Sequence, residues 1–207
     1  CYVVVSEMAK NKTGKKKIVV ASILAALAIQ VGVVADVSAD ESTLTLGGGK
    51  AANGMTNGVS IGYLAESNSH QSIAIGYQAL ATSQYADPAQ PAVAIGAGAK
   101  APGRGGVSLG LDAKSSVRGT ALGSSTRATG FGTFAGGTYA QATNAGDVAI
   151  GGASSDQFND YAVASGGYSV AIGTAAKADG SAAVSIGYKT NAKTSNSLAV
   201  GSESQAT

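Results

Sequence analysis

The hydrophobic positions of this chain follow a short phrase that repeats along most of its length. In each phrase a large aliphatic residue, a small residue and a second large aliphatic residue precede a glycine, as in VAIG at residues 170–173. Large residues that alternate with small ones at a period of two predict a β-strand with two different faces. A weaker additional copy occupies residues 43–49. The glycines that end the ten clear copies are Gly62, Gly76, Gly96, Gly110, Gly123, Gly137, Gly151, Gly173, Gly187 and Gly201.

The spacing of these phrase glycines defines a unit of about 14 residues. Seven of the nine steps between them measure 13 or 14 residues, and the other two measure 20 and 22 residues. The residues three and five positions after each glycine are also small, except Asp156, which predicts a return strand. Each unit is therefore a strand, a glycine turn, a second strand and a polar turn. A turn this tight often requires a positive φ, which glycine adopts at little cost.

One such unit cannot bury its own apolar face, whereas stacked units form a continuous core. Stacking also pairs every strand with the units above and below it. The pattern therefore predicts an all-β fold, a parallel β-solenoid with about 14 residues per coil. At ~4.8 Å between neighbouring strands, the ten coils would form a rod roughly 50 Å long. The alternative is a β-sandwich of regular hairpins, which ten copies in one register disfavour.

The two faces of the first strand differ in a way that predicts their surroundings. The residue two positions before the glycine is Ala or Ser in all ten copies, whereas its neighbours are mostly Val, Ile or Leu. We expect the branched aliphatic face to fill the core, packed against the small residues of the return strand. The flat Ala/Ser face would then point outward, which predicts a self-association interface along the rod. A general bias toward alanine is the alternative explanation.

Composition and charge agree with a thin core and limit the classes of partner. The 207 residues include 30 glycines and no tryptophan, and only 13% are charged. Large side chains are too few for one thick core, yet the chain is too apolar on average to be disordered. Residues 40–207 contain nine Lys or Arg and ten Asp or Glu, so no basic field predicts nucleic-acid binding. The single cysteine, Cys1, forms no disulfide framework.

The first 39 residues have the order of an export signal. A lysine-rich run ends at Lys17, residues 18–34 carry no charge, and VSA at residues 37–39 offers a cleavage site before Asp40. Basic, apolar and small-residue segments in this order predict a secretory signal peptide that is removed from the mature protein. The alternative is a membrane anchor, for which 17 apolar residues are at the short limit.

Several phrases resemble the head repeats of YadA-type trimeric autotransporter adhesins, namely SVAIG (169–173), SIAIG (72–76), AVAIG (92–96), DVAIG (147–151) and AVSIG (183–187). Residues 1–17 likewise resemble the extended signal peptide region of large Gram-negative autotransporters. The resemblance implies that residues 40–207 form a left-handed β-roll head and that three chains associate as a homotrimer. It also implies a coiled-coil stalk and a C-terminal membrane barrel. The extended signal region normally opens with Met, Asn and Lys, whereas this sequence begins with Cys1, so we expect its N-terminal end to be missing. It has no heptad stretch and no set of barrel strands, so we expect the C-terminal stalk and anchor to be missing as well.

The function that the resemblance implies is attachment at the surface of a Gram-negative bacterium, after export through the inner membrane. Its partners would be host extracellular matrix proteins such as collagen, fibronectin or laminin, or the host cell surface. Three identical chains present each weak contact three times, so avidity can exceed a single affinity by about 10²–10⁴-fold. The alternative is a structural role, in which head–head self-association drives autoagglutination and biofilm formation.

The two long steps are the candidate ligand-binding sites. Insertions in a solenoid form loops, and loops often carry recognition. Aromatic and acidic residues gather in these two insertions. The alternatives are plain loop variation and binding that spreads over the repeat faces. The candidate contact residues are Tyr85, Asp87 and Gln90 in the first insertion, and Asp156, Phe158, Asp160 and Tyr161 in the second.

Catalytic and metal-binding patterns are missing from the sequence, so we expect neither an enzyme nor a cofactor. His70 is the one histidine, and it lies in a polar segment between two repeats. No Cys/His cluster predicts zinc, and the acids are scattered singly. Glycine-rich stretches lack the GK[ST] sequence of a phosphate-binding loop. A β-solenoid hydrolase would need carboxylates clustered on one face, and the aligned repeats show none.

Overall fold

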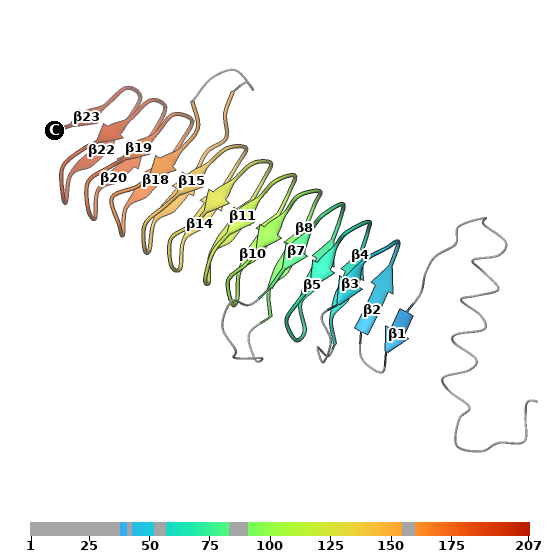
Figure 1. The fold of residues 1–207 in the computed structure, drawn as a ribbon. Helices are drawn as coiled ribbons and strands as arrows, with labels where there is room; N and C mark the ends of the chain where they lie inside the picture. Colours follow the sequence, from blue (N-terminus) through green and yellow to red (C-terminus); the bar gives the residue numbers. More distant parts are fainter. Residues whose placement is uncertain (1–37, 41–42, 52–56, 83–90, 155–159) are drawn as a thin grey trace, which may run out of the picture. The chain divides into compact units, whose positions relative to one another are not determined.

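The computed structural model describes residues 38–207 except 41–42, 52–56, 83–90 and 155–159. Residues 38–207 form a compact unit of their own, and all the strand pairings of the described residues lie within it. Figure 1 shows this unit as a stack of short coils along one axis, each coil carrying a strand on either side. The predicted export signal up to residue 37 lies outside the described residues.

The described strands form two sheets that face each other. The first-strand sheet has 12 strands, β1 (Ser38–Asp40), β2 (Thr43–Leu46), β4 (Val59–Ile61), β6 (Ile73–Ile75), β8 (Val93–Ile95), β10 (Val107–Leu109), β12 (Thr120–Leu122), β14 (Phe134–Gly136), β16 (Val148–Ile150), β18 (Val170–Ile172), β20 (Val184–Ile186) and β22 (Leu198–Val200). The return sheet has 11 strands, β3 (Lys50–Ala51), β5 (Glu66–Ser67), β7 (Leu80–Ala81), β9 (Lys100–Ala101), β11 (Lys114–Ser115), β13 (Arg127–Ala128), β15 (Gln141–Ala142), β17 (Val163–Ala164), β19 (Lys177–Ala178), β21 (Asn191–Ala192) and β23 (Gln205–Ala206).

The strand register confirms the predicted parallel solenoid of about 14 residues per coil. Each first strand pairs in parallel with the same phrase of the next coil, as Val170 does with Val184. The weaker copy at residues 43–49 is also confirmed, because Leu44 pairs with Val59 in the same register. The exception is β1, which pairs antiparallel with β2 at the N-terminal edge of the sheet.

The two insertions leave the roll at opposite edges. The insertion in the 22-residue step separates β16 from its return strand, and the backbone N–H of Ala162 donates to Gly151 at 3.0 Å to close the turn. The small residues predicted three and five positions after Gly151 are therefore supplied by Ala162 and Ala164, instead of Ser154 and Asp156. The insertion in the 20-residue step instead follows the return strand β7 and precedes β8.

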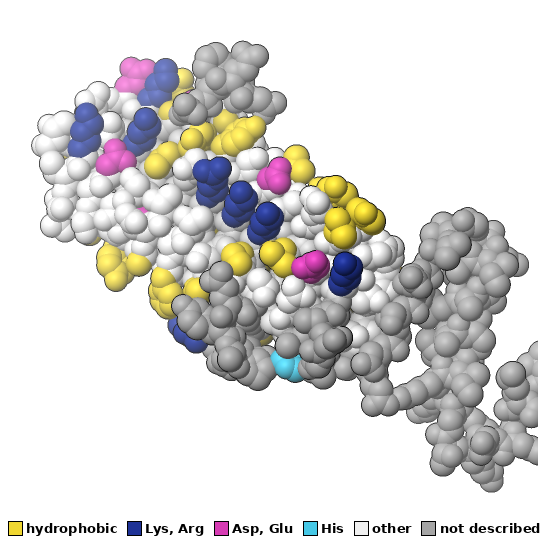
Figure 2. Space-filling model, in the orientation of Figure 1, with side chains coloured by type: hydrophobic (Ala, Val, Ile, Leu, Met, Phe, Trp, Pro, Cys, Tyr) yellow, Lys and Arg dark blue, Asp and Glu magenta, His cyan; other side chains and the backbone are white. Residues whose placement is uncertain are grey.

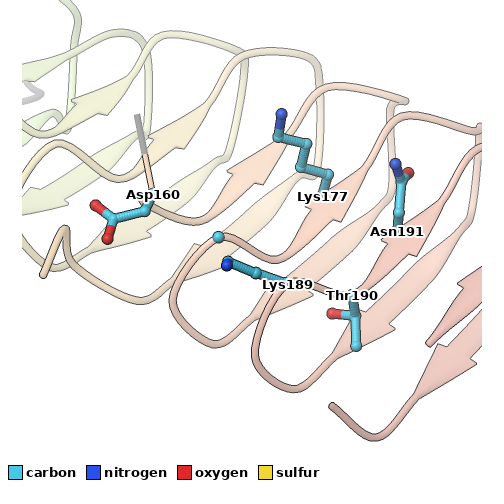
Figure 3. A pocket seen from close by; sticks show the side chains of 6 residues that line it. Asp160, Lys177, Lys189, Thr190 and Asn191 are labelled. Carbon is cyan, nitrogen blue, oxygen red and sulfur yellow. The ribbon is translucent and has the colours of Figure 1, made fainter. Parts of the chain in front are cut away.

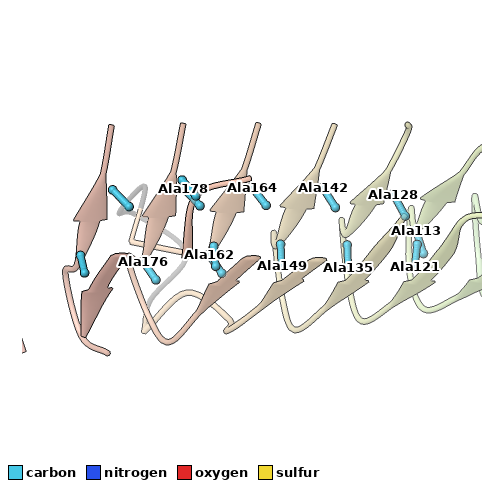
Figure 4. Close-up of a cluster of buried hydrophobic side chains, with 14 residues drawn as sticks. Ala113, Ala121, Ala128, Ala135, Ala142, Ala149, Ala162, Ala164, Ala176 and Ala178 are labelled. Carbon is cyan, nitrogen blue, oxygen red and sulfur yellow. The ribbon is translucent and has the colours of Figure 1, made fainter. Parts of the chain in front are cut away.

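The core is made of alanine and serine, so the prediction that branched residues fill it is wrong. Ala149 is fully buried at 0% exposure, whereas its neighbour Ile150 is 40% exposed and Val148 is partly exposed. The same pattern runs along the first-strand sheet. Figure 4 shows alanine side chains from the two sheets pointing toward one another between them. The predicted outward Ala/Ser interface is therefore also wrong, because that face is the inside of the roll.

The short distance between the sheets explains this inversion. Ser60 on β4 donates its hydroxyl to the backbone oxygen of Lys50 at 2.7 Å and contacts the hydroxyl of Ser67 on β5 at 2.8 Å. Two serine side chains thus span the whole interior. The side chains that fill this space are Ala, Ser and, in two coils, Thr126 and Thr190, and the larger branched residues are left on the outer face.

One fully buried carboxylate joins two successive coils beside the polar turns. Asp147 accepts hydrogen bonds at Oδ1 from the backbone N–H and the hydroxyl of Ser169, at 2.9 and 2.8 Å. Its Oδ2 accepts from the backbone N–H of Asn144 at 2.8 Å. Both oxygens are therefore satisfied, and the carboxylate holds the coil of β16 against the coil of β18.

We expect Asp147→Ala to lower the free energy of unfolding by about 2–4 kcal/mol, because buried donors lose their acceptor. The substitution itself fits, since Ala183 occupies the corresponding position of another coil. The matched control is Thr133→Ala in the adjacent coil, where the side chain donates one hydrogen bond to Gly130. Urea unfolding of residues 38–207 measures both changes, and equal losses would show that the carboxylate adds nothing specific.

Candidate binding surface

The outer face of the first-strand sheet carries an uncovered apolar surface. It consists of the residues one and three positions before the phrase glycines, which we call the apolar ridge. No charged residue occupies these positions from β4 to β22. Leu198 and Val200 are 65% and 57% exposed, and Ile95, Leu109 and Ile186 are also exposed. Exposed apolar surface without charges along most of one sheet face is typical of an interaction site.

A shallow cleft lies on the return-sheet side, next to the second insertion. Its volume is about 360 Å³. Asp160 borders it at one end, and Lys177 and Lys189 come from the two following coils (Figure 3). The complete lining is Asp160, Ala175, Lys177, Lys189, Thr190 and Asn191.

The cleft carries charges of both signs, from Asp160 and from the two lysines. Tyr188 raises the pKa of Lys189 through a side-chain hydrogen bond and its charge, with smaller contributions from Glu203 and Asp160. The Lys189 ammonium lies 5.0 Å from the centre of the Tyr188 ring. Lys189 therefore stays protonated at and above neutral pH, and the cleft favours a polar, charged ligand over an apolar one.

Two of the seven predicted contact residues lie in the described part of the chain. Asp160 accepts hydrogen bonds from the hydroxyl and, at 3.2 Å, from the backbone N–H of Ser154, and it lines the cleft. Tyr161 instead packs against the neighbouring coil. Its hydroxyl accepts from Gln141 Nε2 at 3.0 Å, and its ring lies 6.2 Å from that of Tyr139. The other candidates, Tyr85, Asp87, Gln90, Asp156 and Phe158, lie outside the described residues.

Sequence reasoning missed Lys177 and Lys189, because each is an ordinary residue of a regular repeat. Only coil stacking brings them to the same side of the roll as Asp160. It also missed an exposed aromatic pair, Tyr63 and Tyr77, whose rings stack 6.0 Å apart at an interplanar angle of 18°. A signal for this pair exists, since both tyrosines directly follow a phrase glycine in consecutive coils.

Groups that could support catalysis or metal binding do not gather in the described coils. His70 is half-buried in a turn between β5 and β6. Over the described ranges, no group of three or more His, Cys, Asp or Glu side chains could hold a metal ion. Within the same ranges, no helix has the length and apolar character that crossing a membrane requires.

The fold and its surfaces define a class of protein: a repetitive β-solenoid that presents an apolar sheet face and inserted segments to partners. The comparison with known families narrows this class. The YadA head domain repeat matches residues 55–84, 89–113, 164–190 and 178–204. The described roll is therefore a YadA-like trimeric autotransporter adhesin head. No curated protein matches the chain.

The family carries several properties to this chain. YadA heads are non-enzymatic, which confirms the expectation that the chain is not an enzyme. The family implies a surface-exposed protein of the outer membrane of Gram-negative bacteria, and it implies homotrimer formation and host binding.

Proposed function

We propose that the roll is the host-facing head of an adhesin, a left-handed β-roll that acts as a homotrimer. It attaches to extracellular matrix proteins such as collagen, fibronectin or laminin, or to the host cell surface. Residues 1–39 direct export through the inner membrane and are then removed. The observation that carries the proposal is the match to YadA head repeats within one continuous, in-register roll.

The apolar ridge supports assembly through the first-strand sheet. In a single chain the ridge exposes branched side chains such as Ile150 and Ile186 along many coils. Association of three ridges removes this surface from water, which stabilises the complex at roughly 25 cal/mol per Å² of apolar area. The trimer then presents every outward-facing contact three times. This arrangement converts weak single contacts into tight attachment.

The second insertion supports a local ligand contact, because a cleft with Asp160 and two lysines lies beside it. We therefore propose the insertions as contact sites, with Tyr85, Asp87 and Gln90 in the first and Asp156, Phe158, Asp160 and Tyr161 in the second.

The test is binding of residues 38–207, fused to a trimeric coiled coil, to immobilised collagen, fibronectin, laminin and the same head. We expect the fused trimer to bind at least one matrix protein. The same residues as a monomer, without the coiled coil, should bind that protein with an apparent affinity about 10²–10⁴-fold weaker. Binding to itself alone would contradict host attachment and would favour the self-association alternative.

Two deletions that restore a 14-residue coil locate the contact without disturbing the stack. Removing residues 154–161 leaves Gly152 and Ala153 between Gly151 and Ala162, the same turn length as in the other coils. Removing residues 85–90 leaves a four-residue turn. The second deletion also needs Pro91→Gly, because the residue two positions before the first strand has a positive φ in regular coils, as Ala182 does at 55°. We expect one deletion to abolish binding while both variants remain folded. The 154–161 deletion should unfold at a lower temperature than the parent, because it removes the contacts of Tyr161 with Gln141 and Tyr139. Full binding by both variants would exclude the insertions.

A further inference from the structure

Positive charge is concentrated in the middle of the roll. Residues 96–137 contain five Lys or Arg and one Asp. Residues 40–95 contain one Lys and four Asp or Glu, and residues 138–207 contain three Lys and five Asp or Glu. The near-neutral charge of the whole roll therefore hides a central positive band between two negative ends.

Three of these cations form a straight row on the outer face of the return sheet. Lys114 on β11 pairs in register with Lys100 on β9 and with Arg127 on β13. All three side chains are exposed, because the residues on either side of each point into the core. Figure 2 shows a row of basic side chains running along this face. We call Lys100, Lys114 and Arg127 the cation ladder; at ~4.8 Å between strands, its backbone positions span about 10 Å.

The cation ladder is not neutralised by the described part of the protein. None of its three side chains forms an ion pair or a hydrogen bond with another described residue. The rungs on either side carry Leu80 and Gln141, which are uncharged. Asp112, the one acid of these coils, lies in the turn before β11 and makes no ion pair with a described residue.

The fold does not require cations at these positions. Like charges directly opposite each other in neighbouring strands destabilise a sheet. Elsewhere in the return sheet the corresponding outward position holds Glu66, Val163 or Asn191, and the strand pairing is the same. Three cations in consecutive rungs are therefore unfavourable for folding, and a ligand that neutralises them accounts for their presence.

We propose that the cation ladder binds an extended sulfated polysaccharide. A linear polymer with permanent negative charges along its length complements a straight, regularly spaced row of cations on an open face. A compact anion such as phosphate would instead need a closed pocket with converging donors. Single-stranded nucleic acids are usually held by aromatic side chains that stack on bases, and the adjoining rungs offer Leu80 and Gln141. Sulfated polysaccharide would be an additional class of ligand for the adhesion function proposed above. The cation ladder lies on the return sheet, whereas the apolar ridge lies on the first-strand sheet.

The test uses residues 38–207 as the coiled-coil trimer and heparin as the probe, over a range of salt concentrations. The variant Lys100→Gln/Lys114→Gln/Arg127→Gln is expected to bind at least tenfold more weakly. Its plot of log K against log salt should be shallower by about 2, since about 0.7 counterions per charge are released from a flexible polyanion. The matched control is Lys50→Gln, an exposed cation at the same outward position on β3, outside the ladder and the cleft, with Glu66 in the adjoining rung. We expect the control to lose less than twofold.

Other polyanions, tested in the same binding assay, identify the chemical class of the ligand. Desulfated heparin and hyaluronate should bind at least tenfold more weakly than heparin, and equal binding would overturn the requirement for sulfate. If double-stranded or single-stranded DNA bound the head as tightly as heparin does, the assignment of the ligand to polysaccharides would be overturned. The triple variant should unfold at the same temperature as the parent or higher, because repulsion between the cations is removed. Lost heparin binding with unchanged binding to matrix proteins would support the ladder as a separate site. Matrix binding without heparin binding would overturn the ladder and leave the adhesion proposal intact.

Discussion

Replacing Gly110 by alanine is expected to lower the free energy of unfolding of the roll by about 3 kcal/mol or more. Gly110 has a φ of 133°, which side-chain-bearing residues rarely adopt. A Cβ atom there would lie 2.5 Å from the backbone oxygen of Gly123 in the next coil. The strained φ costs about 1–3 kcal/mol, and moving a hydrogen-bonded coil away from the new methyl group costs about as much again.

The matched control for this glycine is Gly132→Ala. Gly132 also has a positive φ, 65°, but no atom lies within 4 Å of an added Cβ. Ala182 already adopts a φ of 55° at the same place in another coil. We expect a loss of about 1 kcal/mol, from the backbone conformation alone. Urea unfolding of both variants followed by circular dichroism separates the two effects. If both variants lost the same free energy, close approach between coils would not be the reason for the phrase glycine.

The second large effect is expected at Ala149, which points into the core. Ala135 and Ala171 lie beside it in the neighbouring rungs, and all three are fully buried. Ala149→Leu adds three carbon atoms to an interior that two small side chains already fill. The sheets would have to separate, and we expect a loss of about 3 kcal/mol or more in the free energy of unfolding.

The adjacent residue gives the opposite result. Ile150 is 40% exposed on the apolar ridge, so Ile150→Asp leaves the core intact and should cost about 1 kcal/mol in the single chain. We expect this variant to remain folded but to lose the proposed trimeric state of residues 38–207, as measured by sedimentation. Ser202→Asp, an exposed turn position, serves as the control and should leave the trimer unchanged. A trimeric Ile150→Asp variant would exclude the ridge as the interface.

The candidate sites were predictable only in part. Asp160 was expected at a contact surface because the 22-residue step stands out in the repeat, and it lines the cleft. Its neighbours Lys177 and Lys189 could not be predicted, since nothing in their local sequence differs from an ordinary repeat. The cation ladder was hidden for a different reason. Net charge averaged over residues 40–207 is close to neutral, and stacking then places three cations in consecutive rungs.

The sequence by itself determined the coil length, the parallel register, the positive φ at the phrase glycines and the positions of both insertions. These properties follow from spacing, which stacking of identical units converts directly into strand pairing. Only the tertiary structure decided which face of each strand lies inside. An alternation with a period of two is the same whichever face is buried, and side-chain size suggested the wrong one. The hydrogen-bonded coils bring the two sheets so close that Ser60 touches Ser67, and only small side chains fit between them.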